Sequence, residues 1–165
     1  MENRFSNSPL DPLMRMSDTE GVQTRQLVCF TIGDETYGID IRAVREIRAW
    51  SATTLLPNAP DFVRGVINLR GTVVPILDLR ARFGRGQTEP TKVHVVIVVS
   101  IESRVVGILV DTVSDILAVA ETDIRPVPEI GGADVQEYLD GLITQGDQMI
   151  ALVAADRIVA PVAVH

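Results

Sequence analysis

An internal repeat limits the possible folds of this chain more than any other feature of its sequence. When the chain is shifted by sixty-nine residues, residues 27–57 align without a gap on residues 96–126, with eight identities in thirty-one positions. The identical pairs are Ile32/Ile101, Gly38/Gly107, Ile39/Ile108, Val44/Val113, Ile47/Ile116, Ala49/Ala118, Thr53/Thr122 and Pro57/Pro126. One duplicated unit explains this match better than two unrelated segments do.

The order of segments continues beyond the aligned region. Gly65-Val66-Ile67 corresponds to Gly141-Leu142-Ile143, and each is followed by a glycine turn and an apolar run, residues 73–79 and 149–153. A unit of about sixty residues has a marginal core when isolated. We therefore expect the two units to pack together and to share an apolar seam, where a groove could form.

Both repeat units are predicted to form β-strands. Short runs rich in Val, Ile and Thr alternate with glycine-containing turns, which is typical of an all-β sandwich or barrel. Pro75 falls within one such run, so we expect an edge strand or a bulge there. Ile41, Val44 and Ile47 lie three residues apart, a spacing that predicts one face of a short helix or a tight turn. This apolar stripe either belongs to the core or stays exposed and accepts a partner.

Composition and charge argue against several classes of function. The net charge is −7 and the isoelectric point is about 4.8, which opposes binding to nucleic acid. Five arginines between Arg64 and Arg85 are interrupted by Asp78, and we interpret them as solvated strand faces and turns. The single Cys29 lies in an apolar run and is expected to be buried. Without a signal segment or a membrane-spanning run, we expect a soluble, cytoplasmic protein that does not insert into the membrane.

No arrangement of residues in the sequence predicts catalysis. Catalytic sites require a nucleophile beside a base, a metal cluster, or a paired acid and base, and phosphate-binding loops require glycine-rich motifs. None of these is visible. His94 adjoins an apolar strand, which favours a structural role over phosphate acceptance, and His165 is the last residue. We therefore expect a protein without catalytic residues, metal or cofactor.

Several long motifs resemble the CheW family of bacterial chemotaxis coupling proteins. The resemblance extends from about Leu27 to Arg157 and rests on four stretches. These are residues 33–48 (GDETYGIDIRAVREIR), residues 64–80 (RGVINLRGTVVPILDLR), residues 105–115 (VVGILVDTVSD), and Ile124-Arg125-Pro126 before Tyr138-Leu139 and Gly141. The chain departs from many family members at its end, where residues 156–159 followed by Pro161 leave room for about one helical turn.

The resemblance implies an all-β fold of two interwound, five-stranded SH3-like β-barrels with short helical turns. We expect a disordered tail at residues 1–25, a CheW-like domain at residues 26–160 and a short tail at 161–165. The domain would contain barrel subdomains near 26–84 and 92–160, with strand exchange between them left open. The implied partners are the cytoplasmic tip of a chemoreceptor and the regulatory domain of the histidine kinase CheA, in membrane-associated receptor arrays.

The resemblance also assigns a receptor-binding groove residue by residue. Its members are Ile41, Val44, Glu46, Ile47, Gly65, Arg70, Val95 and Val106. Val44 and Ile47 would contact a receptor helix through apolar atoms, and Glu46 and Arg70 would set its register. Gly65 and Arg70 also have simpler interpretations as turn residues. The kinase-facing residues are not identified.

Two alternative functions stay open from the sequence. The same scaffold could serve a chemosensory-like pathway that controls pili or development. A barrel protein that binds a small ligand is the other alternative, and it predicts titratable residues clustered at the seam.

Overall fold

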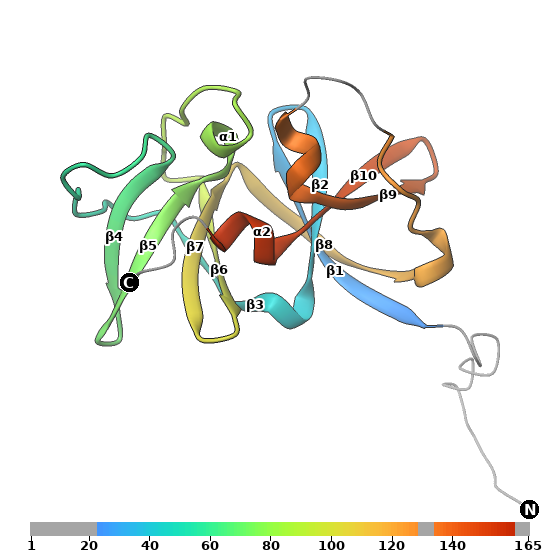
Figure 1. Cartoon of the computed structure of the whole chain (residues 1–165), viewed down its shortest axis with the longest axis horizontal. Helices are drawn as coiled ribbons and strands as arrows, with labels where there is room; N and C mark the ends of the chain where they lie inside the picture. Colours follow the sequence, from blue (N-terminus) through green and yellow to red (C-terminus); the bar gives the residue numbers. More distant parts are fainter. Residues whose placement is uncertain (1–22, 129–133, 161–165) are drawn as a thin grey trace, which may run out of the picture.

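The computed structural model describes residues 23–128 and 134–160 (Figure 1). β1 begins inside the predicted tail of residues 1–25, and the rest of that tail, like residues 161–165, lies outside the described residues. The first repeat forms β1 (Thr24–Ile32), β2 (Glu35–Asp40), η2 (Ile41–Ala43), β3 (Val44–Ala49), β4 (Val63–Leu69), β5 (Thr72–Asp78) and α1 (Leu79–Arg82). The second forms β6 (Val95–Ile101), β7 (Arg104–Val110), β8 (Thr112–Ala120), η3 (Glu121–Asp123), η4 (Asp134–Tyr138), β9 (Leu139–Gln145), β10 (Gln148–Val153) and α2 (Ala155–Val159).

The strands form two five-stranded sheets, and each sheet takes strands from both repeats. One sheet has the order β8-β1-β2-β10-β9, and the other has the order β3-β6-β7-β5-β4. The repeats therefore exchange β3 and β8, together with the hairpins β4–β5 and β9–β10. Residues 26–84 and 92–160 do not each fold into their own barrel, because every sheet needs strands from both segments.

Each sheet is closed into a barrel by the segment that follows one of its end strands, β3 or β8. After β3, Thr54 pairs with Val66 of β4, and after β8, Arg125 pairs with Leu142 of β9. Both bridges consist of two backbone hydrogen bonds, with N–O distances between 2.8 and 2.9 Å. These pairings turn the sheets into two barrels, called barrel A (β8-β1-β2-β10-β9) and barrel B (β3-β6-β7-β5-β4) from here on. The predicted all-β class is confirmed.

Three apolar clusters fill the molecule. One lies inside barrel A and contains Leu27, Ile143 and Leu152, and one lies inside barrel B and contains Val74 and Leu109. The largest cluster combines residues of both sheets, such as Phe30 and Ile39 from barrel A with Ile97 and Ile108 from barrel B. The shared apolar seam expected from the small size of the repeats is therefore the main core of the protein.

The spacing of three in the first repeat has a different cause from the predicted one. Only residues 41–43 form a short 3₁₀ turn, and Val44 and Ile47 lie on the extended strand β3. Val44 pairs with Val99 and Glu46 with Val98, so Arg45 is an extra residue that bulges from the strand. The bulge brings Val44 and Ile47 to the same face, although strand residues three apart otherwise point to opposite faces.

Pro75 is accommodated without the predicted edge position, because β5 lies between β7 and β4. The parallel pairing of β5 with β7 begins only at Ile76. On the other side Pro75 lies opposite Val66, whose backbone N–H and C=O both bond to Thr54. The missing N–H of proline therefore costs no ladder hydrogen bond.

Candidate partner-binding surface

Five of the predicted receptor-binding residues lie along the seam between the barrels. Ile41, Val44 and Val95 are partly buried and pack against the seam core. Ile47 lies opposite Ile97 of that core, yet 46 % of its surface is exposed. Val106 is only 1 % exposed, so its side chain has no free surface for a partner and belongs to the core.

Glu46 and Arg70 are brought together although they lie on different elements. Glu46 is on β3, and Arg70 occupies the turn between β4 and β5, where its φ of 52° is left-handed. The Arg70 guanidinium donates a hydrogen bond to Glu46 Oε1 in an ion pair. This pairing, with further help from Arg48 and Arg45, holds the pKa of the Glu46 carboxyl below its ordinary value. β3 therefore carries an apolar side chain toward the seam and an ion pair on its other side.

Gly65 lies at a bulge in β4, where no side chain could be placed. Its φ is +129°, and a Cβ atom would lie 2.3 Å from the carbonyl oxygen of Thr54. Gly141 is the equivalent residue of barrel A, and a Cβ there would lie 2.9 Å from the carbonyl oxygen of Arg125. The glycine that both repeats carry at this position therefore lets the segment that closes each barrel come close to the backbone of β4 or β9. This structural role accounts for Gly65 without a partner.

Sequence reasoning missed a polar network that joins the barrels around Asp111, between β7 and β8. Asp111 Oδ2 accepts hydrogen bonds from Gly33 N at 2.7 Å and from Arg80 Nη2 at 2.8 Å. His94 Nδ1 accepts from the backbone N–H of Thr91, and its Nε2 lies 3.5 Å from Asp111 Oδ1. His94 is therefore part of the structural network that joins the barrels.

The interpretation of the arginines as solvated is wrong for several of them. Arg64 donates to the carbonyl of Thr88 and lies 3.8 Å from the buried carboxylate of Asp78. Arg80 bonds to Asp111, and the Arg82 guanidinium lies against aromatic rings. For Arg80 and Arg82 the one signal in the sequence was their position between Asp78 and Phe83, which by itself does not identify the partners.

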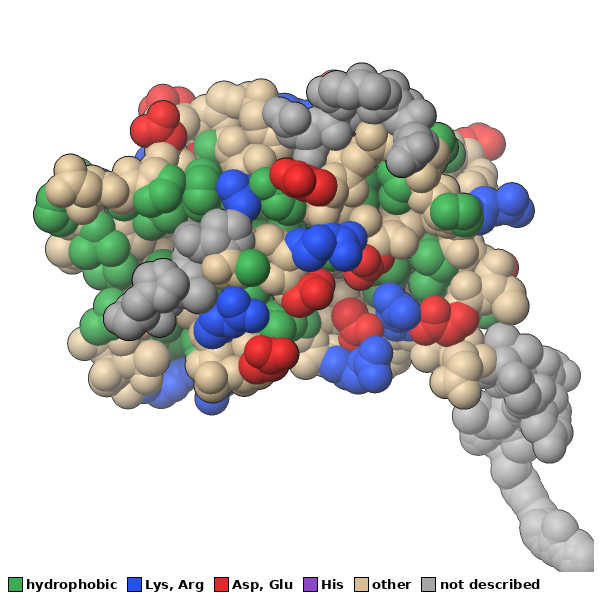
Figure 2. Space-filling view, viewed as in Figure 1, with side chains coloured by type: hydrophobic (Ala, Val, Ile, Leu, Met, Phe, Trp, Pro, Cys, Tyr) green, Lys and Arg blue, Asp and Glu red, His purple; other side chains and the backbone are tan. Residues whose placement is uncertain are grey.

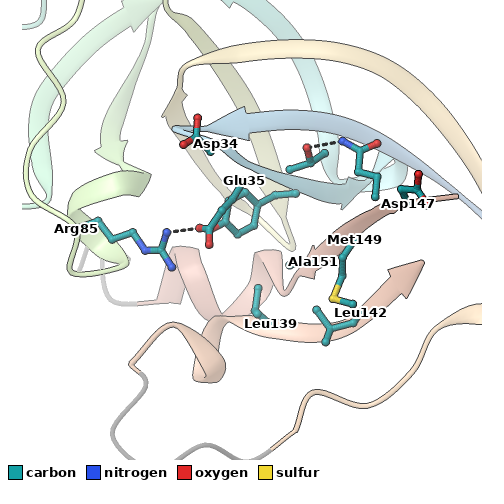
Figure 3. A pocket seen from close by; sticks show the side chains of 11 residues that line it. Asp34, Glu35, Arg85, Leu139, Leu142, Asp147, Met149 and Ala151 are labelled. Atoms are coloured by element: carbon teal, nitrogen blue, oxygen red, sulfur yellow. Dashed lines mark hydrogen bonds and ion pairs between the residues drawn. The ribbon is translucent and has the colours of Figure 1, made fainter. Parts of the chain in front are cut away.

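A cavity of about 470 Å³ opens beside barrel A at the start of β2. Leu139, Leu142 and Met149 form its apolar side, and Asp34 and Asp147 lie at its rim (Figure 3). Glu35 reaches from β2 to Arg85, which follows α1, and the two form an ion pair at the mouth (Figure 3).

Cys29 is buried, as predicted, and burial raises the pKa of its thiol. Among residues 23–128 and 134–160, no three His, Cys, Asp or Glu side chains are grouped so that they could hold a metal ion. None of the helices in these ranges has the length and apolar character needed to cross a membrane.

Exposed apolar side chains lie on both barrels. On the face seen in Figure 2, hydrophobic side chains gather at the end formed by β4 and β5, whereas acidic and basic side chains alternate over the middle. Val73 of β5 is 64 % exposed, and Leu55, in the segment after β3, is 79 % exposed. Ile116, which corresponds to Ile47 in the repeat, is 56 % exposed on β8 of barrel A.

Comparison with known proteins gives one consistent result. The family model described as a CheW-like domain matches residues 26–162. The chain is 48 % identical over 134 residues to a chemotaxis protein CheW of Rhizobium meliloti (strain 1021), covering 81 % of this chain and 86 % of that protein. It is 44 % identical over 136 residues to a chemotaxis protein CheW of Klebsiella aerogenes, covering 82 % of each.

A solved structure shares the fold. The crystal structure of the scaffolding protein TtCheW from Thermoanaerobacter tengcongensis superposes with a TM-score of 0.72 at 33 % identity, covering 79 % of this chain and 84 % of that one. The prediction of two interwound SH3-like barrels is confirmed by this match together with the sheet order. On the strength of the family match, the sequence relatives and the shared fold, this chain belongs to the CheW-like family.

Proposed function

We propose that this chain is a non-catalytic adaptor that couples chemoreceptors to the histidine kinase CheA. Its family membership makes it a chemotaxis signalling adaptor, and the solved relative is named a scaffolding protein. The observation that carries the finer proposal is the exposure of Ile47 beside the seam, next to the Glu46–Arg70 ion pair. An apolar side chain that borders a large core and stays accessible offers a contact for an apolar helix face.

The proposed receptor surface is the β3 edge of barrel B. It comprises Ile41, Val44, Ile47 and Val95 as apolar contacts and the Glu46–Arg70 pair as a polar border. Val106 and Gly65 support this surface from within. β3 is the terminal strand of its sheet order, so a receptor helix can lie along its outer edge. The kinase would contact a different surface, through its regulatory domain of the same fold.

The sharpest test exploits the repeat. Ile47→Glu places a carboxylate in the proposed apolar contact, whereas Ile116→Glu makes the same change at the equivalent position of barrel A. Burial of an unpaired polar group costs about 2–7 kcal/mol, and a micromolar interaction is worth about 8 kcal/mol. We expect Ile47→Glu to abolish calorimetric binding to a soluble receptor-tip fragment and Ile116→Glu to preserve it.

Co-purification with the receptor fragment and the kinase regulatory domain tests the coupling itself. The wild-type chain should recover both partners in one complex, and Ile47→Glu should retain the kinase domain alone. Unchanged receptor binding by Ile47→Glu would refute the β3 surface. Failure of the wild-type chain to bind either partner would refute the adaptor role.

A further inference from the structure

A guanidinium group lies between two aromatic rings that belong to different barrels. The Cζ atom of Arg82 is 4.2 Å from the centre of the Phe62 ring and 4.6 Å from the centre of the Tyr138 ring. Phe62 precedes β4 of barrel B, and Tyr138 ends η4, which leads into β9 of barrel A. The charge on Arg82 therefore attracts ring faces of both barrels at once.

Hydrogen bonding does not explain this position of Arg82. Its Nε atom is buried and has no hydrogen-bond acceptor among the described residues. A buried donor without an acceptor is unfavourable, so other contacts must hold the side chain in place. Within the described residues, the two ring faces are the contacts seen for its guanidinium.

The neighbouring residue extends this contact into an aromatic chain across the seam. Phe83 lies 5.2 Å from Tyr37 and 6.1 Å from Tyr138, and Tyr37 lies 5.7 Å from Phe30, measured between ring centres. Apart from Trp50 and Phe5, which lies outside the described residues, every aromatic residue of the chain is in this group. Aromatic contacts depend on ring geometry, unlike the aliphatic contacts that fill the rest of the seam.

We propose that Arg82 is a positioning residue that holds the two barrels in one relative orientation and thereby keeps the β3 surface in its binding shape. α1 lies at one end of the seam and β3 at the other (Figure 1). A small rotation at Arg82 therefore changes how β3 is presented to a partner. The Glu35–Arg85 ion pair links the barrels on the same side as α1 (Figure 3) and supports the contact.

Two measurements on the full chain test the role of Arg82. Spin labels on Thr72→Cys in barrel B and Thr144→Cys in barrel A, in a Cys29→Ala background, report the distance between the barrels by pulsed electron resonance. Both label sites are exposed. Arg82→Met keeps the apolar stem and removes the charge, so we expect a broader distance distribution. Arg82→Lys keeps a cation and should restore a narrow one.

Binding of the receptor-tip fragment is the second measurement, and this part alone rests on the proposed adaptor function. We expect Arg82→Met to weaken binding by about five- to thirtyfold, the range that a desolvated cation–π contact supports. Arg104→Met is the matched control, because Arg104 is in barrel B and its ion pair with Glu102 stays within one hairpin. This control should change neither the distances nor the affinity.

The two measurements separate the two proposals. An unchanged distance distribution in Arg82→Met, or an equal broadening in Arg104→Met, would overturn the role of Arg82. A broadened distribution with unchanged receptor affinity would leave Arg82 as a link between the barrels and overturn its effect on the β3 surface. If the wild-type chain does not bind the receptor fragment, the adaptor proposal fails while the distances still test Arg82.

Discussion

At the scale of single residues, the charged side chains have structural tasks that their spacing in the sequence does not show. Asp78 is fully buried, and its carboxylate accepts hydrogen bonds from both the backbone N–H and the hydroxyl of Thr88 at 2.7 Å. It is also the N-cap residue of α1, where it accepts a longer bond from Ala81 N. One carboxylate thus secures both α1 and the connection that leads to β6.

Replacing Asp78 should therefore destabilise the fold strongly. Asp78→Ala removes the helix cap and leaves the buried Thr88 groups without an acceptor, so we expect a loss of about 2–4 kcal/mol in the free energy of unfolding. Urea denaturation measures this loss. Asp61→Ala, at an exposed carboxylate, is the control and should change stability by less than about 0.5 kcal/mol. Equal losses in the two variants would contradict the assignment.

The Glu46–Arg70 ion pair should make the stability of the folded chain depend on pH, and the lowered pKa of Glu46 sets the direction of this dependence. Because Arg70 lowers the pKa of the Glu46 carboxyl in the folded state, the pair is complete above the ordinary pKa of glutamate and is lost as the pH falls through the lowered value. Carbon NMR titration should show Glu46 titrating below its ordinary range. In Arg70→Met the midpoint should move up, and an unmoved midpoint would show that Arg70 is not the main cause.

At the scale of elements, the duplication preserves irregularities as well as strands. β3 is bulged at Arg45, and the pairing of β8 with β1 also shifts register at the equivalent place, between Val28 and Phe30. β4 and β9 each carry one further bulge, next to Gly65 and Gly141 respectively. Bulges bend a strand, so their conservation between the repeats accounts for two barrels closed in the same way.

Substitutions at two glycines distinguish the cost of backbone strain from the cost of a steric clash. Gly65 and Gly71 both have positive φ, but a Cβ would strike the Thr54 carbonyl only at Gly65 and would meet no atom within 4 Å at Gly71. We expect Gly71→Ala to cost about 1–2 kcal/mol and Gly65→Ala to cost clearly more. Thermal unfolding of both variants checks the order, and a reversed order would contradict the role of Gly65 in barrel closure.

At the scale of the whole molecule, the seam makes the two barrels one folding unit. The largest core cluster draws residues from both sheets, and strands of each repeat complete the barrel of the other. Barrel B is the continuous segment from β3 to β7, which is inserted between β2 and β8 of barrel A, and the two barrels share the seam core. Unfolding should therefore be cooperative.

Two probes test this cooperativity. Fluorescence of Trp50, which packs against the interior cluster of barrel B, and far-ultraviolet circular dichroism of the whole chain should give coincident urea transitions. Phe83→Ala, at the seam, should lower stability by about 3–5 kcal/mol and keep the two transitions coincident. Ile143→Val, inside barrel A, should cost about 0.5–1.5 kcal/mol. A Trp50 transition that separates from the dichroism signal would show that the barrels unfold independently.

The sequence by itself determined the duplication, the all-β class and the family, because repeats, turn residues and long motifs are local properties of the chain. It also predicted an apolar seam from the small size of each repeat. Only the tertiary structure decided which strands share a barrel, since pairing between β1 and β8 or between β3 and β6 joins segments far apart in the sequence. The same holds for the partners of Arg70, Arg80 and Arg82, because a charge pattern shows that a charge exists but not which distant side chain the fold brings to it.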